Sequence, residues 1–326
     1  MNDKIKKWIS PALTLLIVLL PLGLKSFYTM RILSTLGIYL IISMGLNVLL
    51  GFTGLVSIGQ AGIFGISAYV CGIFMERVGI NFWVAFLFAL AVGLLIGLAL
   101  GAITLKLEAG YLAITTLGLC LMVKNILQNW SSMTNGFEGL LGVPKPKLFG
   151  YVIRSQKAVL ITIVIAAAII FWLLKFFLGS KYGRNLRASR DNEIAASMMG
   201  IDVVKTRLLA FTIASTTAAI AGWLYAGLYG ALFPDYFNMD LSVLFMCIVI
   251  VGGQGTILGP IIGAFVVVYG RELLANLGEG QMLVYGIILV FLCVVQPSGL
   301  YGLFSKGFEK VKKALSKKKE VPENGR

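Results

Sequence analysis

Residues 82–104 read FWVAFLFALAVGLLIGLALGAIT, an apolar run without one charged side chain. A helix needs about 20 apolar residues to cross a bilayer whose hydrocarbon core is about 30 Å thick. The run is therefore long enough to span a membrane as a single helix. Gly93, Gly97 and Gly101 recur at every fourth position within it, so small residues share one helix face and favour close packing against another helix.

The rest of the 326-residue chain has the same character, with 58% hydrophobic residues, 13% charged residues and a mean hydropathy of +0.91. Soluble domains carry about 25% charged residues. We therefore predict an all-α, polytopic membrane protein with about ten transmembrane helices, some of them broken or re-entrant. The candidate spans are 9–24, 32–50, 61–76, 82–104, 111–128, 158–178, 206–230, 240–252, 257–275 and 281–297. The short runs 61–76 and 240–252 lie beside glycine-rich breaks and fit half-helices, so a count of eight stays open.

The basic residues indicate the orientation of these spans, because Lys and Arg accumulate in cytoplasmic loops. With the N-terminus inside, about 19 of the 28 basic residues fall on the cytoplasmic side. We therefore expect both termini to be cytoplasmic, with a permease domain over 1–305 and a basic tail over 306–326. The tail is read as a partly disordered segment that sets the topology, and an amphipathic helix on the anionic membrane lipids is the alternative. The run 9–24 is read as a retained first span, and a cleaved secretory signal is the alternative.

Several classes of function lack the residues that they need. The chain has no histidine, no GxxxxGK[ST] phosphate loop and no paired CxxC cysteines. We therefore expect no catalytic residues, no metal site and no cofactor, and a membrane enzyme or assembly scaffold is disfavoured. The net charge of +14 is explained by the topology, so no nucleic-acid partner is expected. No carboxylate lies at the centre of a span, which disfavours a proton-driven antiporter.

Two glycine-rich stretches interrupt the apolar pattern, one in each half of the chain. The first is GLNVLLGFTGLVSIGQAGIFGISAY, from Gly45 to Tyr69, and the second is VGGQGTILGPIIGAF, from Val251 to Phe265. Broken helices at membrane depth occur where they are packed in protein or line a cavity, and paired breaks point to a central site in a transporter. The polar residues at or near the breaks are candidates for a substrate path: Ser57, Gln60, Thr115, Thr116, Asn135 and Gln254. The alternative is that the glycines serve helix packing alone.

The polar segment 180–205 is the most specific part of the sequence. Arginines recur every three residues, and an Asp-Asn-Glu cluster precedes two alanines and a glycine. This order predicts a short helix parallel to the membrane that begins near the acidic cluster and ends at the glycine. Two roles stay open, a helix that docks on a partner and a solvated connector whose arginines fix the topology. The candidate residues are Arg184, Arg187, Arg190, Asp191, Glu193, Ala195, Ala196 and Gly200.

Six blocks together resemble the permease subunits of ABC importers for branched-chain amino acids, the LivM-like family. Two lie in the polar segment: GRNLRASRDNE (183–193) is similar to the family's basic-acidic lead-in, and EIAASMMGI (193–201) to its EAA-type coupling motif. The chain departs from the EAA pattern by placing Ile194 between Glu193 and the alanines. The other blocks are GFTGLVSIGQAGIFGISAY (51–69), LKLEAGYLAITTLG (105–118), TNGFEGLLGVP (134–144) and VGGQGTILGPIIGA (251–264).

The resemblance implies a non-enzymatic permease subunit in the bacterial cytoplasmic (inner) membrane. It implies four further partners: a second, LivH-like permease, two cytoplasmic ABC ATPase subunits and an extracytoplasmic solute-binding protein. The segment 180–205 would then couple ATP hydrolysis to import of leucine, isoleucine or valine. Two alternatives stay open at this point, a related importer of urea or short amides and an ion-coupled secondary amino-acid carrier.

Overall fold

The computed structural model describes residues 26–104, 109–148, 151–153, 155–274, 284, 286–287, 290 and 299–302. The predicted span 9–24, most of the predicted span 281–297 and the basic tail 306–326 lie outside the described residues. What the structure describes is mostly helical, as predicted, with two very short β ladders in addition.

Six segments of the described residues are long and apolar enough to cross a membrane. They are α2 (Phe27–Thr53), α4 (Phe82–Thr104), α5 (Ala109–Asn129), α7 (Gln156–Gly179), α10 (Val203–Tyr229) and the segment Pro234–Gly252, which joins η3 (Pro234–Tyr236) to α11 (Met239–Gly252). The predicted run 61–76 forms one helix, α3 (Gln60–Arg77), and the run 257–275 forms α12 (Gly259–Ala264), the π-helix η4 (Phe265–Tyr269) and α13 (Gly270–Leu273). The predicted count of about ten spans is not confirmed.

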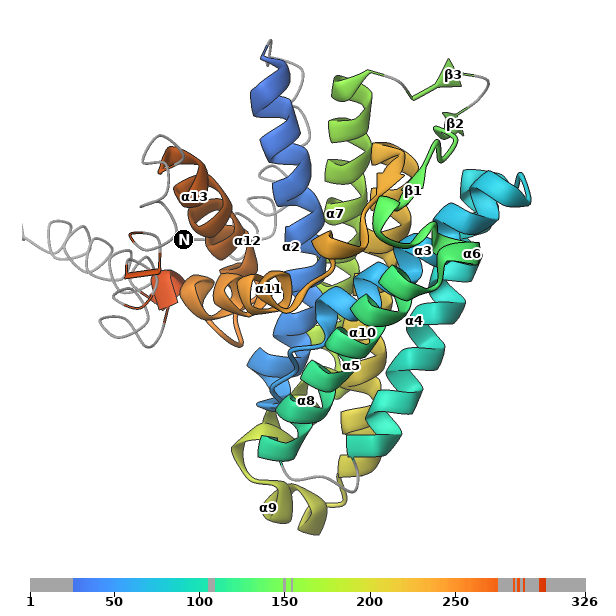
Figure 1. Cartoon of the computed structure of the whole chain (residues 1–326). Helices are drawn as coiled ribbons and strands as arrows, with labels where there is room; N and C mark the ends of the chain where they lie inside the picture. Colours follow the sequence, from blue (N-terminus) through green and yellow to red (C-terminus); the bar gives the residue numbers. More distant parts are fainter. Residues whose placement is uncertain are drawn as a thin grey trace, which may run out of the picture.

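Helix α10 is the centre of the bundle and packs against α2, α3 and α4 (Figure 1). The glycine stripe of α4 makes one of these contacts, as predicted. A Cβ atom added at Gly93 would lie 2.6 Å from Cα of Thr216, and one at Gly97 would lie 2.6 Å from Cα of Thr212. Because these neighbours are backbone atoms, only glycine allows α4 and α10 to approach this closely.

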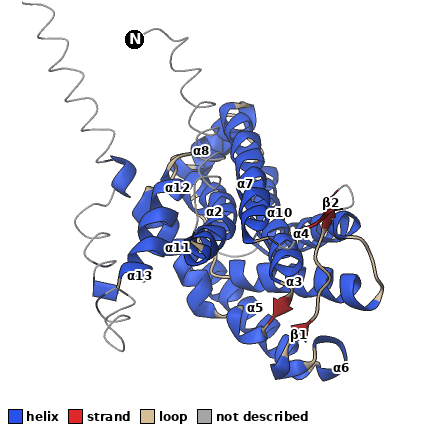
Figure 2. Cartoon of the chain, turned by 90° about the horizontal axis from the view of Figure 1, so that it is seen from above, coloured by secondary structure: helices blue, strands red, loops and turns tan. Residues whose placement is uncertain are grey.

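The helices are interrupted at both predicted breaks. The first break separates α2 from α3 over residues 54–59, and the second separates α11 from α12 over residues 253–258. Helices α12 and α13 lie on the side of α2 away from α4 in both views (Figure 2).

The two ends of the bundle carry different structures (Figure 1). At one end, α6 (Ser131–Thr134), η2 (Gly136–Glu138) and strand β1 (Leu140–Leu141) follow α5, and β1 pairs antiparallel with β4 (Ala231–Leu232). Strands β2 (Lys147–Leu148) and β3 (Tyr151–Val152) form the second ladder there. At the opposite end, α8 (Lys181–Asp191) and α9 (Glu193–Met198) connect α7 to α10. We refer to these as the β1 end and the α9 end.

Candidate coupling segment and substrate path

The predicted helix in segment 180–205 is present as α9, and hydrogen bonds at both of its ends fix it. The side chain of Asn192 accepts a hydrogen bond from the backbone N–H of Ala195 (3.0 Å), so the acidic cluster begins the helix. Gly200 adopts φ = 79°, and the N–H of Ile201 donates to the carbonyl of Ala196 (3.0 Å). This arrangement is a Schellman motif, which favours glycine at the left-handed position. The preceding residues form a second helix, α8, that the sequence reading did not separate from α9.

Helix α9 presents apolar side chains to the outside of the bundle. Ile194 is 71% exposed, Met198 is 83% exposed and Met199 is 84% exposed. Ala195 is also exposed, whereas Ala196 is buried against the rest of the protein. A short helix held at both ends, with three large apolar side chains facing outward, has the geometry of a docking element.

The base of α9 is joined to α10 by polar contacts. The guanidinium of Arg207 forms an ion pair with Glu193, and its Nε lies 3.1 Å from Oε1 of the carboxylate. Asp202 caps α10 by accepting a hydrogen bond from the N–H of Lys205 (3.0 Å), and this bond, with the Lys205 ammonium, lowers the pKa of the Asp202 carboxyl. The cap is therefore complete above the ordinary pKa of an aspartate and is lost as the pH falls through the lowered value.

The three periodic arginines of α8 do not act together. Arg187 places its guanidinium 5.2 Å from the ring centroid of Phe52, and Nη1 of Arg190 donates to the carbonyl oxygen of Gly51, so both reach the end of α2. All three arginines are exposed, as is Asp191. At 3.6 residues per turn, three positions fall about 60° short of a full turn, so the first and third arginines diverge by about 120°.

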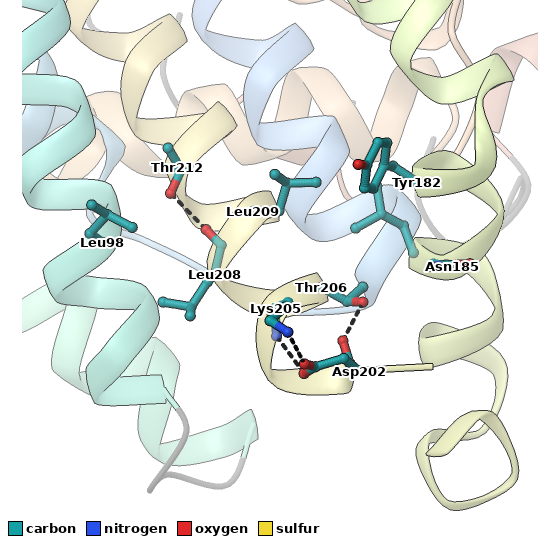
Figure 3. Close-up of a pocket in the computed structure, with 10 residues that line it drawn as sticks. Leu98, Tyr182, Asn185, Asp202, Lys205, Thr206, Leu208, Leu209 and Thr212 are labelled. Atoms are coloured by element: carbon teal, nitrogen blue, oxygen red, sulfur yellow. Dashed lines mark hydrogen bonds and ion pairs between the residues drawn. The ribbon is translucent and has the colours of Figure 1, made fainter. Parts of the chain in front are cut away.

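An open pocket of about 460 Å³ lies on another side of α8 (Figure 3). Leu98 of α4, Tyr182 and Leu186 of α8, and Leu209 of α10 line it, and Asp202 lies near its rim. The lining is mainly apolar. The pocket separates part of α8 from α4 and α10, so α8 has room on this side.

The second break meets the last turns of α2, just before the first break, and Asn47 of α2 makes the contact. Its side-chain amide donates to the carbonyl of Thr256 (2.8 Å), and its side-chain oxygen accepts from the N–H of Gly255 (3.0 Å). Asn47 is only 2% exposed. A side chain at Gly51 would collide with the backbone of Gly255, so glycine is required where the two backbones touch.

Three of the predicted path residues gather where α3 begins. Ser57 and Gln60 are each 1% exposed, and neither Ser57 Oγ nor Gln60 Oε1 has a hydrogen-bond partner among the residues that the structure describes. Thr116 of α5 accepts a hydrogen bond from the N–H of Ile58 (3.0 Å) and so joins α5 to the first break. Unpaired buried polar atoms are rare in proteins, and they point to a missing partner or to a functional role.

The other three predicted path residues lie elsewhere. Thr115 points away from this group and donates to the carbonyl of Tyr111 on its own helix (2.8 Å). Asn135 is exposed at the β1 end, where it adopts a left-handed backbone with φ = 59°. Gln254 lies in the second break but is exposed. The glutamines of the two breaks therefore differ in their surroundings, although the sequence around them looks alike.

Sequence reasoning missed three residues that hold this region together: Asn47, Thr256 and Arg207. The signal for Asn47 was a single amide inside the apolar run 32–50, where a polar side chain needs a partner. The partners of Asn47 and Arg207 lie far away along the chain, and no local pattern identifies them.

Comparisons with known proteins agree with this architecture. A family model described as "Branched-chain amino acid transport system / permease component" matches residues 28–293. The chain is 32% identical over 290 residues to the high-affinity branched-chain amino acid transport system permease protein LivM of Salmonella typhimurium. The aligned region covers 81% of this chain and 67% of that protein. The same permease of Escherichia coli is 32% identical over 294 residues, with the same coverage.

The chain is more distantly similar to LivH, another high-affinity branched-chain amino acid transport system permease protein of Salmonella typhimurium. The two are 24% identical over 285 residues, which cover 81% of this chain and 91% of LivH. No solved structure matches the chain. The family match covers most of the chain, and the apolar helices support a multi-pass membrane protein. The chain therefore belongs to the family of permease components of branched-chain amino acid transport systems.

Proposed function

We propose that this chain is the membrane-spanning permease subunit of an ATP-driven ABC importer that moves leucine, isoleucine or valine across the bacterial cytoplasmic membrane. The chain itself is not an enzyme, and ATP hydrolysis belongs to separate subunits. The support is its family and its similarity to two LivM permeases of branched-chain amino acid transport.

The exposed apolar face of α9 is the observation that carries the ATP-driven part of this proposal. A permease without a nucleotide site needs a rigid surface on which a separate ATPase can push. Helix α9 offers Ile194, Met198 and Met199 for this contact, and the pair of Glu193 with Arg207 transmits force to α10. In this arrangement the α9 end faces the cytoplasm and the β1 end faces the outside, which is the orientation that the sequence predicts for segment 180–205.

The proposed complex has four further chains. Two ATPase subunits bind on the cytoplasmic side, one of them at α9, and a solute-binding protein delivers the amino acid at the β1 end. A second permease completes the path, and the similarity of this chain to LivH supports a partner of the same fold. Closure of the ATPase pair would displace α8 and α9 and tilt the spans, opening the path to each side in turn.

Ser57 and Gln60 are the best-supported contacts along the path. Their side-chain atoms, which have no partner among the described residues, are buried beside the N-terminus of α3. An amino acid passing through an opened path offers an ammonium group to Gln60 Oε1 and a carboxylate to the hydroxyl of Ser57 and to the helix N-terminus. A path with few polar groups and a mainly apolar lining suits a substrate with an apolar side chain.

Uptake by proteoliposomes that contain the isolated complex tests the proposal. We expect leucine to accumulate only when ATP is supplied to the ATPase side, with no effect of collapsing the ion gradients. Accumulation by this chain alone, driven by an ion gradient, would identify a secondary carrier. ATP-driven accumulation of urea or a short amide, with none of leucine, would identify a related importer and refute the assigned substrate.

A further inference from the structure

The side chain of Arg190 lies where α8 meets the end of α2 and both helix breaks. A Cβ atom added at Gly54, the first residue of the first break, would lie 3.4 Å from Cγ of Arg190. Its Nη1 donates a hydrogen bond to the carbonyl oxygen of Gly51, in the last turn of α2. The same guanidinium lies against the second break, because a Cβ atom added at Gly255 would fall 2.9 Å from Nη1. One side chain of α8 therefore contacts residues of both halves of the chain.

Asn47 fastens the second break to α2 about one turn before this point. Its two hydrogen bonds hold the backbone of Gly255 and Thr256, and Gly51 touches the backbone of Gly255 directly. The last turns of α2 and the start of the second break are therefore a single packed unit. Arg190 is the polar side chain by which α8 holds that unit.

The position of Arg190 in the chain connects this unit to α9. Only Asn192 separates α8 from α9, so Arg190 lies three residues before the first residue of the docking helix. None of the ion pairs among the described residues includes Arg190, and its partner is a neutral carbonyl. Such a contact orients the helix end and can be exchanged for another carbonyl when α8 moves. The pocket on another side of α8 leaves space for that movement.

We propose that Arg190 is the positioning residue that transmits the displacement of α9 to the two helix breaks, with Asn47 keeping the second break against α2. This inference rests on the proposed function, since it assumes that an ATPase moves α9. When Arg190 is lost, the ATPases still hydrolyse ATP, but α2 and the second break no longer follow α8. ATP is then hydrolysed with less substrate transported.

The test measures leucine imported per ATP hydrolysed, in proteoliposomes that contain the complete importer. For Arg190→Gln we expect the ATPase rate to persist while the ratio falls about tenfold, the scale of a typical coupling between sites. Arg190→Lys keeps the charge and one donor, so its ratio should lie between those of Arg190→Gln and the wild type. Lys181→Gln removes one positive charge from the same helix without touching either break, and its ratio should equal that of the wild type.

An unchanged ratio in Arg190→Gln overturns the inference. If that variant does not assemble, Gly255→Ala displaces the guanidinium from the other side, and its ratio should fall as well. An unchanged ratio in this second variant likewise overturns the inference. Failure of the wild-type complex to import leucine with ATP is a different outcome, because it refutes the proposed function itself.

Discussion

The close contact of α4 with α10 predicts opposite effects for the same substitution at two glycines. At Gly97, a new methyl group would lie 2.6 Å from Cα of Thr212. Carbon atoms in contact prefer about 3.5–4.0 Å, so the two helices would have to separate locally by about 1 Å. Overpacking of this kind costs about 1–3 kcal/mol. The gain from replacing glycine by alanine within a helix is about 0.5–1 kcal/mol, so Gly97→Ala should be destabilised by about 1 kcal/mol net, within a range of about 0–2.5 kcal/mol.

Gly118 in α5 is the matched control, because a Cβ atom added there meets nothing within 4 Å. Gly118→Ala should keep only the helical gain of about 0.5–1 kcal/mol. Thermal unfolding of the two purified variants in the same detergent checks this prediction. We expect the Tm of Gly97→Ala to lie below that of the wild type and the Tm of Gly118→Ala to lie at or above it. A Tm of Gly97→Ala equal to the wild type would refute the packing argument.

Three further predictions concern the proposed coupling segment and path. Gly200→Ala forces a side chain into a left-handed backbone conformation at a cost of about 1–2 kcal/mol, so the amide hydrogens of α9 should exchange several-fold faster. Exchange at the wild-type rate would contradict the Schellman motif at the end of α9. Ser57→Ala and Gln60→Leu remove atoms that have no partner, so both variants should keep their Tm yet lose transport; normal transport would remove them from the path. A double-mutant cycle of Glu193→Gln with Arg207→Gln should give a coupling energy of about 0.2–1 kcal/mol in the free energy of unfolding, because the ion pair is partly exposed. Additive effects of the two substitutions would show that this ion pair does not join α9 to α10.

Local patterns were enough to predict the elements that depend on nearby residues. The apolar runs located the long helices, and the spacing of Gly93, Gly97 and Gly101 indicated a packing face that the structure places against α10. The start of α9 at the acidic cluster and its end at Gly200 also followed from capping preferences. Each of these features is decided within a few turns of helix, so the sequence contains the necessary information.

Long-range contacts were not predictable in the same way. The β1–β4 pairing joins residues 140–141 to 231–232 through strands of two residues, which leave no periodic signal. The sequence placed both Gln60 and Gln254 among the candidates for the substrate path, but Gln60 is buried and Gln254 is exposed. The second break is held instead by Asn47 of α2, which bonds to the backbone of Gly255. Backbone partners carry no side-chain signature, so this junction becomes visible only in three dimensions.

The spacing of the arginines in α8 shows why a regular pattern can mislead. A repeat of three suggests one continuous basic face, but a helix of 3.6 residues per turn rotates such a repeat steadily around its axis. Arg190 therefore contacts the end of α2, whereas Arg184 lies about 120° away from it around the helix axis.

Docking of an ATPase on α9 is the central claim, and co-purification of the tagged chain with its ATPase subunits tests it most directly. Ile194→Glu combined with Met198→Glu places charge on the exposed apolar face, and Met133→Glu combined with Phe137→Glu makes the same change at two exposed apolar side chains of the β1 end. Both preparations are analysed by mass spectrometry and by their ATP hydrolysis. We predict that the ATPase subunits are lost from the α9 variant and retained by the variant of the β1 end. Equal recovery of the ATPase subunits with both variants would contradict the role of α9.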